Sequence, residues 1–132
     1  MCSISGCFNS KISFGEYEKL NRKLAHRGPD NSSVKRYDFK NKKLFLGHNR
    51  LSIQDLSPDA NQPMENSRFV IVFNGENYNH IEIRKSLSFK EWRIHSDTET
   101  ILLSPRGRRS RLFLERRNRQ QSRSLHNDPI KQ

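Results

Sequence analysis

The chain has little of what membrane-spanning or disulfide-rich proteins need. Only 32% of its 132 residues are apolar, which predicts a thin core or a chain that lies partly outside its core. No run of 18 or more apolar residues occurs, and this excludes a membrane-spanning helix. Cys2 and Cys7 are the only cysteines, so a disulfide framework is not expected, and we predict a cytoplasmic protein. The start, MCSISGCFNSK, lacks the basic and apolar regions of a signal peptide.

Acidic residues are also few, with 14 against 25 lysines and arginines, which gives a formal net charge of +11. The excess is uneven: residues 104–132 contain eight arginines and one lysine against Glu115 and Asp128, a net charge of +7. A basic tail can bind nucleic acid through phosphate contacts. This tail has no alternation of glycine with aromatic residues, no zinc-ligand spacing and no helical period. A nucleic-acid-binding module is therefore an alternative that the pattern does not favour.

The spacing of apolar residues predicts a mixture of strands and helices in the first three quarters of the chain. We expect strands at 2–8, 44–53, 68–73 and, briefly, Trp92–His95. We expect helices at 14–24, at 78–88 and from 97 onward. The first helix would bury the face formed by Phe14, Tyr17, Leu20 and Leu24, and the segment HRGPDNSS after it reads as a loop. Gly47 in the second strand predicts a bulge or a close approach of another segment.

The last expected helix has a clear start and an early end. Ser96 followed by Glu99 has the spacing of a capping box, in which each side chain bonds the other residue's backbone. Pro105 would stop this helix after about two turns. Beyond it no apolar period continues, and arginine replaces lysine almost entirely. We therefore predict one domain over 1–103 and a disordered basic tail over 104–132, and we hypothesise that a shifted reading frame encodes the tail.

Cys2 is the candidate nucleophile. Removal of Met1 would leave a first residue that carries both a thiol and a free α-amine. An α-amine is partly neutral at cellular pH, and it can accept the proton of the thiol without any distant base. A cysteine at position 2 is a weak signal by itself. Cys7 is interpreted as a small buried apolar residue, and the scattered histidines lack zinc spacing.

Five segments in chain order strengthen the interpretation of Cys2: MCSISG, LAHRGPD, GHNRLSI, FNGENYNH and SDTETI. Together they resemble the N-terminal glutaminase domain of asparagine synthetases, which are class II glutamine amidotransferases. The resemblance covers residues 1–103 and leaves the tail unmatched. It implies an α+β fold, the αββα sandwich of N-terminal-nucleophile hydrolases, of which this chain would hold roughly the first half.

The resemblance also implies a set of site residues. Cys2 would attack the side-chain amide of glutamine, and the Asn74 side chain with the Gly75 backbone N–H would form the oxyanion hole. Arg50 would bind the α-carboxylate of glutamine, as a guanidinium suits a bidentate contact. Asp97 would bind the α-ammonium group. The residues expected to line the same pocket are Leu51, Ser52, Ile53 and Glu76.

What the chain lacks relative to that family limits the predicted activity. No Ser-Gly-Gly-rich pyrophosphate loop occurs, so ATP and Mg²⁺ are expected only in a synthetase domain that is missing here. The glutaminase half would need no cofactor or metal, and its expected partners are glutamine and, in full-length relatives, that synthetase domain. Asn77 stands where relatives usually carry an aliphatic residue. An inactive truncated fragment that keeps the site residues is the second alternative.

Overall fold

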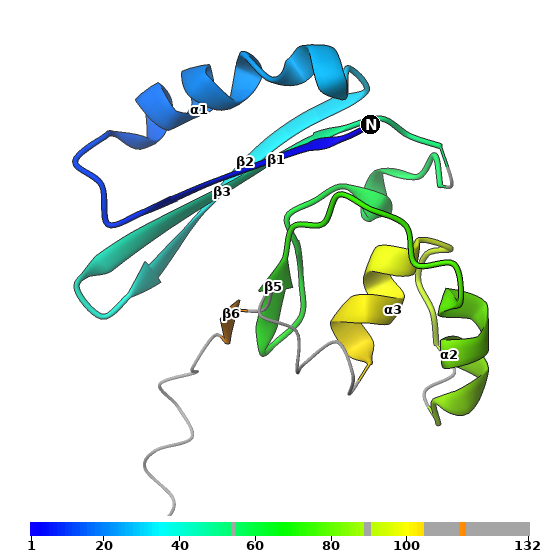
Figure 1. The fold of residues 1–132 in the computed structure, drawn as a ribbon. Coiled ribbons are helices and arrows are strands. Elements are labelled where there is room, and N and C mark those ends of the chain that lie inside the picture. The colour runs from blue at the N-terminus through cyan, green and yellow to red at the C-terminus, as the bar shows by residue number, and fades with distance from the viewer. Residues whose placement is uncertain (54, 89–90, 105–113, 116–132) are drawn as a thin grey trace, which may run out of the picture.

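The computed structural model describes residues 1–53, 55–88, 91–104 and 114–115. These form two three-stranded sheets and the helices that cover them (Figure 1). Sheet A consists of β1 (Ser3–Phe8), β2 (Asn31–Phe39) and β3 (Lys42–Arg50). Sheet B consists of β4 (Met64–Glu65), β5 (Phe69–Ile71) and β6 (Leu114–Glu115). The helices are α1 (Phe14–Arg22), α2 (His80–Ser86) and α3 (Asp97–Leu103), with short 3₁₀ turns at Ala25–Arg27 and Pro58–Ala60.

Sheet A has the order β1-β3-β2, and all of its pairs are antiparallel. Side chains of β3 alternate between its two faces, as a pleated strand requires. Phe45 faces α1, where it contacts the rings of Phe14 and Tyr17. Leu44 and Leu46 face the other way, toward sheet B. β3 therefore carries both the surface that binds α1 and the surface that packs on the second sheet.

Sheet B packs against sheet A through one face and against α3 through the other. Val70 joins a buried cluster with Leu44 and Leu46 of β3. Its neighbour Ile71 joins a second cluster that includes Leu102 of α3. The layers thus follow one another as helix, sheet, sheet and helix (Figure 1). This mixed α/β order agrees with the expected sandwich, while assignment to the N-terminal-nucleophile hydrolases stays a prediction.

Besides the aromatic contacts, buried polar residues join α1 to sheet A. A capping box starts the helix: Glu16 N–H donates to Ser13 Oγ, and Ser13 N–H donates to the Glu16 carboxylate. Asn21, with 1% of its surface exposed, accepts a hydrogen bond from Ser5 Oγ at 2.8 Å. A Cβ on Gly47 would lie 2.4 Å from Asn21 Oδ1. The close approach expected at Gly47 is therefore confirmed, and glycine is needed there because this side chain fills the space.

Several expectations about the elements are wrong. β2 was not predicted, and its first residues lie in the segment expected to be a loop. Trp92–His95 forms no strand. Leu20 is 49% exposed, because Tyr17 and Asn21 form the buried face of α1.

The expected capping box of α3 is half correct. Ser96 Oγ accepts the backbone N–H of Thr98, as a cap should. The Glu99 carboxylate instead accepts the backbone N–H groups of Arg93 and Ile94. It also lies 3.7 Å from Nη2 of Arg84. A buried carboxylate is satisfied by whichever donors the fold brings near, and here those donors come from the preceding loop and from α2.

The expected tail falls almost entirely outside the described residues. The exceptions are Ser104, which caps the end of α3, and Leu114–Glu115, which forms β6 and pairs antiparallel with β5. For Leu114–Glu115 the structure shows a strand where we expected disorder. Among the described residues, no helix is long and apolar enough to cross a membrane.

Candidate functional site

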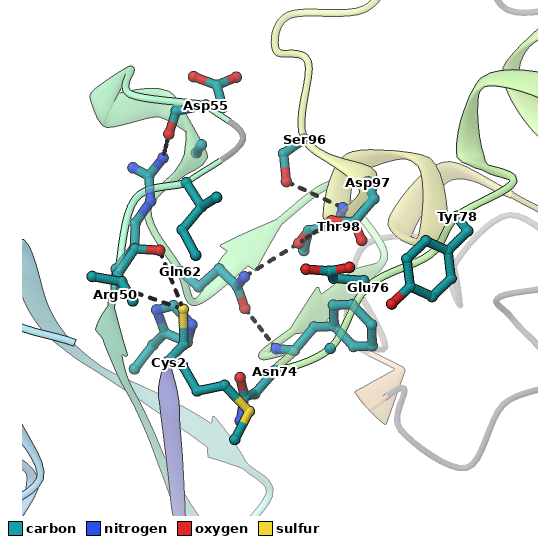
Figure 2. Close-up of a pocket in the computed structure, with 17 residues that line it drawn as sticks. Cys2, Arg50, Asp55, Gln62, Asn74, Glu76, Tyr78, Ser96, Asp97 and Thr98 are labelled. Atoms are coloured by element: carbon teal, nitrogen blue, oxygen red, sulfur yellow. Dashed lines mark hydrogen bonds between the residues drawn. The ribbon is translucent and has the colours of Figure 1, made fainter. Parts of the chain in front are cut away.

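One cavity of about 400 Å³ lies where the end of β3 meets the start of α3. Figure 2 shows the 17 residues that line it, which come from the N-terminus, the end of β3, the segment between β3 and β4, the loop after β5, and the cap and first turn of α3. Eight of the nine predicted site residues line this cavity: Cys2, Arg50, Leu51, Ile53, Asn74, Gly75, Glu76 and Asp97. Ser52 does not line it, and its backbone N–H donates to Asp30 Oδ2. The fold thus gathers residues from position 2 to position 97 around one space.

Cys2 lies just before β1 and is half-buried. Leu51 N–H donates to its Sγ at 3.3 Å, and Sγ lies 3.7 Å from the carbonyl oxygen of Leu51. These contacts arise because β1 pairs with β3, so the residue before β1 meets the residue after β3. The two strands therefore fix the position of the sulfur at the cavity wall.

Arg50 ends β3 with 7% of its surface exposed. Its Nη1 donates to the Ser57 carbonyl and to Asn61 Oδ1, each at 2.8 Å, and its Nη2 donates to the Asp55 carbonyl. The guanidinium therefore organises the loop after β3. A guanidinium has five N–H donors, so a carboxylate bound here would share the group with these loop contacts.

Asn74 and Gly75 form the corner that follows β5, and both are exposed to the cavity side of the molecule. The ring of Phe73 packs beneath the corner: a Cβ on Gly75 would lie 2.9 Å from Phe73 Cζ. Any larger residue at 75 would push on that ring. The absence of a side chain at Gly75 keeps its backbone open to a ligand.

Asp97 opens α3 and is 5% exposed. Its Oδ2 accepts the backbone N–H of Asn77 at 2.7 Å, and its Oδ1 lies 3.4 Å from Thr98 Oγ1. The carboxylate thus faces the cavity from the side opposite Cys2 and is already joined to the corner segment (Figure 2).

His48 is a cavity residue to which sequence reasoning gave no chemistry. It is fully buried, and neither ring nitrogen has hydrogen-bond geometry with another described residue. Burial lowers its pKa to about 4; the nearby Phe73 main chain opposes this shift, and the charge of Arg50 adds to it. A signal existed in the sequence, because His48 has the same strand parity as Leu44 and Leu46 and so shares their buried face.

Gln62 and Thr98 are two further cavity residues that sequence reasoning missed. Gln62 lies in a polar loop segment and has no periodic neighbour, so nothing in the sequence predicted its burial. Among the described residues, no group of three or more histidine, cysteine or acidic side chains could hold a metal ion.

Comparison with known proteins identifies the relatives of this chain. A family described as "Glutamine amidotransferase domain" matches residues 1–107. Asparagine synthetase [glutamine-hydrolyzing] 1 of Bacillus subtilis is 34% identical over 111 residues, covering 78% of this chain and 17% of that protein. Asparagine synthetase B [glutamine-hydrolyzing] of Escherichia coli is 38% identical over 109 residues, covering 77% and 19%.

A plant relative gives the same result. Asparagine synthetase [glutamine-hydrolyzing] 1 of Arabidopsis thaliana is 40% identical over 85 residues, covering 63% of this chain and 14% of that protein. The chain thus spans less than a fifth of the length of these three curated relatives. No solved structure matches the chain.

Proposed function

The chain belongs to the glutamine amidotransferase domain family, and from this premise we propose that its cavity hydrolyses glutamine at Cys2. The observation that carries the proposal is the shared cavity of Cys2, Arg50, Asn74, Gly75 and Asp97. These residues supply a thiol, a cation, two neutral donors and an anion. A glutamine needs the same set: its amide is attacked, its carboxylate and ammonium are bound, and its oxyanion is stabilised.

The first half-reaction forms a thioester. After removal of Met1, the α-amine of Cys2 takes the proton of the thiol. Sγ then bonds to the carbonyl carbon of the glutamine side chain, and the carbonyl oxygen becomes an oxyanion. The carbon–nitrogen bond breaks, and ammonia leaves with the proton that the α-amine held. The product on the enzyme is a γ-glutamyl thioester.

The second half-reaction releases glutamate. Water adds to the thioester carbon, a second oxyanion forms, and the carbon–sulfur bond breaks as the sulfur regains a proton. Both oxyanions would accept hydrogen bonds from the Asn74 side-chain amide and from the Gly75 backbone N–H. One such donor contributes about 2.7–4 kcal/mol to the stability of the transition state.

Substrate orientation would come from the two charged residues. Arg50 would bind the α-carboxylate and Asp97 the α-ammonium, and their positions at different walls of the cavity support this division (Figure 2). The ammonia would pass to an acceptor such as aspartate in a synthetase domain that uses ATP and Mg²⁺, within the cytoplasm. The names of the relatives, which are glutamine-hydrolysing asparagine synthetases, support an acceptor of this kind. The use of ATP and Mg²⁺ and the cytoplasmic location stay predictions.

The test is ammonia release from glutamine by the purified chain after Met1 has been removed. Cys2→Ala should reduce the release to the uncatalysed background. Cys7→Ala is the matched control, since Cys7 lies further along β1 and does not line the cavity. It should leave the rate unchanged. The proposal is refuted if ammonia release survives in Cys2→Ala. It is also refuted, in favour of an inactive fragment, if the chain that lacks Met1 and keeps Cys2 releases no ammonia.

A further inference from the structure

The segment from Phe73 to Asn77, which contains the Asn74–Gly75 corner, is anchored at both ends by buried side chains. Phe73 N–H donates to Gln62 Oε1 at 2.6 Å. At the other end, Asn77 N–H donates to Asp97 Oδ2 at 2.7 Å. Short hydrogen bonds at both ends restrict the backbone between them.

The two anchors are themselves joined through Thr98. Gln62 Nε2 donates to Thr98 Oγ1 at 3.3 Å, and the Thr98 hydroxyl donates to Asp97 Oδ1 at 3.4 Å (Figure 2). Gln62, Thr98 and Asp97 are exposed by only 7%, 2% and 5%. The hydroxyl thus accepts from an amide and donates to a carboxylate, so the chain of donors runs in one direction toward the negative charge. Such a buried, aligned chain is mutually reinforcing.

Gln62 is also next in sequence to a residue that binds Arg50. The residue before Gln62 is Asn61, whose Oδ1 accepts Arg50 Nη1 at 2.8 Å. On the α3 side, the backbone N–H of Thr98 donates to Ser96 Oγ at the cap of the helix. Gln62 therefore lies between the residue proposed for the α-carboxylate, the residue proposed for the α-ammonium and the corner proposed for the oxyanion.

On the basis of the proposed function, we infer that Gln62 and Thr98 are positioning residues that couple α-ammonium binding at Asp97 to the geometry of the Asn74–Gly75 corner. An ammonium group at Asp97 fixes the orientation of the carboxylate. The carboxylate then fixes Asn77 directly and Phe73 through Thr98 and Gln62. The corner is held for oxyanion binding when an α-amino acid occupies the cavity, so amides without the ammonium group react slowly even when they bind.

The experiment compares two electrophiles that attach to Cys2 in the full chain lacking Met1. Both carry the carbon skeleton and carboxylate of glutamine with a reactive ketone in place of the amide, and only one carries the α-ammonium. For each, the maximal inactivation rate and the half-saturating concentration are measured by mass shift on the first residue. Iodoacetamide, which needs no oxyanion corner, reports the reactivity of the thiol.

Thr98→Val removes the hydroxyl and keeps the shape of the side chain. The maximal rate with the ammonium-bearing electrophile should fall by about tenfold, the factor for one lost hydrogen bond to a charged group. The rate with the des-amino electrophile, the rate with iodoacetamide and the half-saturating concentration should change little. Thr98→Ser restores the hydroxyl and should restore the rate.

Thr100→Val is the matched control, because Thr100 lies on the same helix, is fully buried and accepts a hydrogen bond from Arg84 instead. It should leave the ratio of the two maximal rates unchanged. The coupling is refuted if Thr98→Val slows both electrophiles alike, changes only the half-saturating concentration, or has no effect. If iodoacetamide modifies Cys2 of the chain that lacks Met1 and carries no substitution, and neither ketone does, the proposed glutamine chemistry fails. The coupling then fails with it.

Discussion

Helices α1 and α3 cover opposite sides of the two sheets, and different forces hold them there. Leu102 of α3 is 1% exposed and packs in a cluster with Ile71 and Met64. The other buried residues of α3, 97–100, are polar and lie in its first turn. On α1 the buried residues are Tyr17 and Asn21, and Tyr17 also packs on the ring of Phe45. The hydroxyl of Tyr17 lies 2.7 Å from Ser5 Oγ.

The polar contact fixes one geometry more strictly than the apolar one. The amide of Asn21 bonds Ser5 on β1 and Ser32 on β2, and the Asn49 side chain of β3 donates to the Asn21 carbonyl. Each bond has a required distance and direction, whereas apolar side chains can repack with modest loss. We therefore hypothesise that Leu102 of α3 contributes stability through burial and that the hydrogen bonds of Asn21 on α1 set the alignment of the strands next to Cys2 and Arg50.

The largest effect on stability is expected from the apolar cluster around Leu102 of α3. Leu102→Ala should lower the free energy of unfolding by about 2–5 kcal/mol, because it removes buried methyl groups and leaves a cavity. Urea unfolding of both proteins measures the difference. Leu20→Ala on α1 is the control, since Leu20 is 49% exposed and its loss should cost less than about 0.5 kcal/mol. Equal costs for the two variants would contradict the division of roles.

The second prediction concerns His48, a fully buried polar residue on the face of sheet A that packs on sheet B. Its pKa is lowered to about 4 by burial, so the folded protein holds the ring neutral. Below the ordinary pKa of about 6.5 the unfolded chain gains a proton that the folded protein does not. Stability is therefore complete above that pH and falls as the pH decreases toward 4.

Between pH 7 and pH 5 this linkage should cost about 2 kcal/mol. His48→Gln has no group that titrates in this range, so its stability should change less over the same interval. Urea unfolding at several pH values gives both slopes. If the two proteins lose stability in parallel, His48 is not the group responsible.

The smallest of the three effects on stability is expected from the polar contacts of α1. Asn21→Ala should cost about 1–2 kcal/mol, since it removes the side-chain amide that bonds Ser5 Oγ on β1 and Ser32 Oγ on β2. The sharper readout is position: cross-strand proximity between β1 and β3, measured by nuclear Overhauser contacts, should weaken in Asn21→Ala and persist in Leu102→Ala. The reverse pattern would show that α3, and not α1, aligns these strands.

Much of the element order was predictable because it depends on local patterns. The alternation in CSISGCF gave β1, the Asn-Gly pair gave the corner after β5, and Ser96 gave the start of α3. β2 was missed because its first three residues belong to the turn-rich segment HRGPDNSS and only Tyr37 among its residues is buried. A strand with so few buried residues has almost no apolar alternation to detect.

The residues of the candidate site likewise fall into those that the sequence predicted and those that only the structure revealed. Cys2, Arg50, Asn74 and Asp97 were nominated from motifs, and the cavity contains all four. Gln62 and His48 were not nominated, because their roles depend on partners or surroundings far away in the chain. Gln62 and Thr98, for example, are 36 positions apart.

The sequence by itself determined the family, through the resemblance of five segments in chain order, and with it the candidate nucleophile. It also determined the starts of α1 and α3, since these follow from residue type and from spacing within one turn. Only the tertiary structure decided which side chains are buried and which donors meet which acceptors. Burial depends on what another segment places opposite a residue, and a carboxylate such as that of Glu99 bonds the nearest unsatisfied donors rather than those that local spacing predicts.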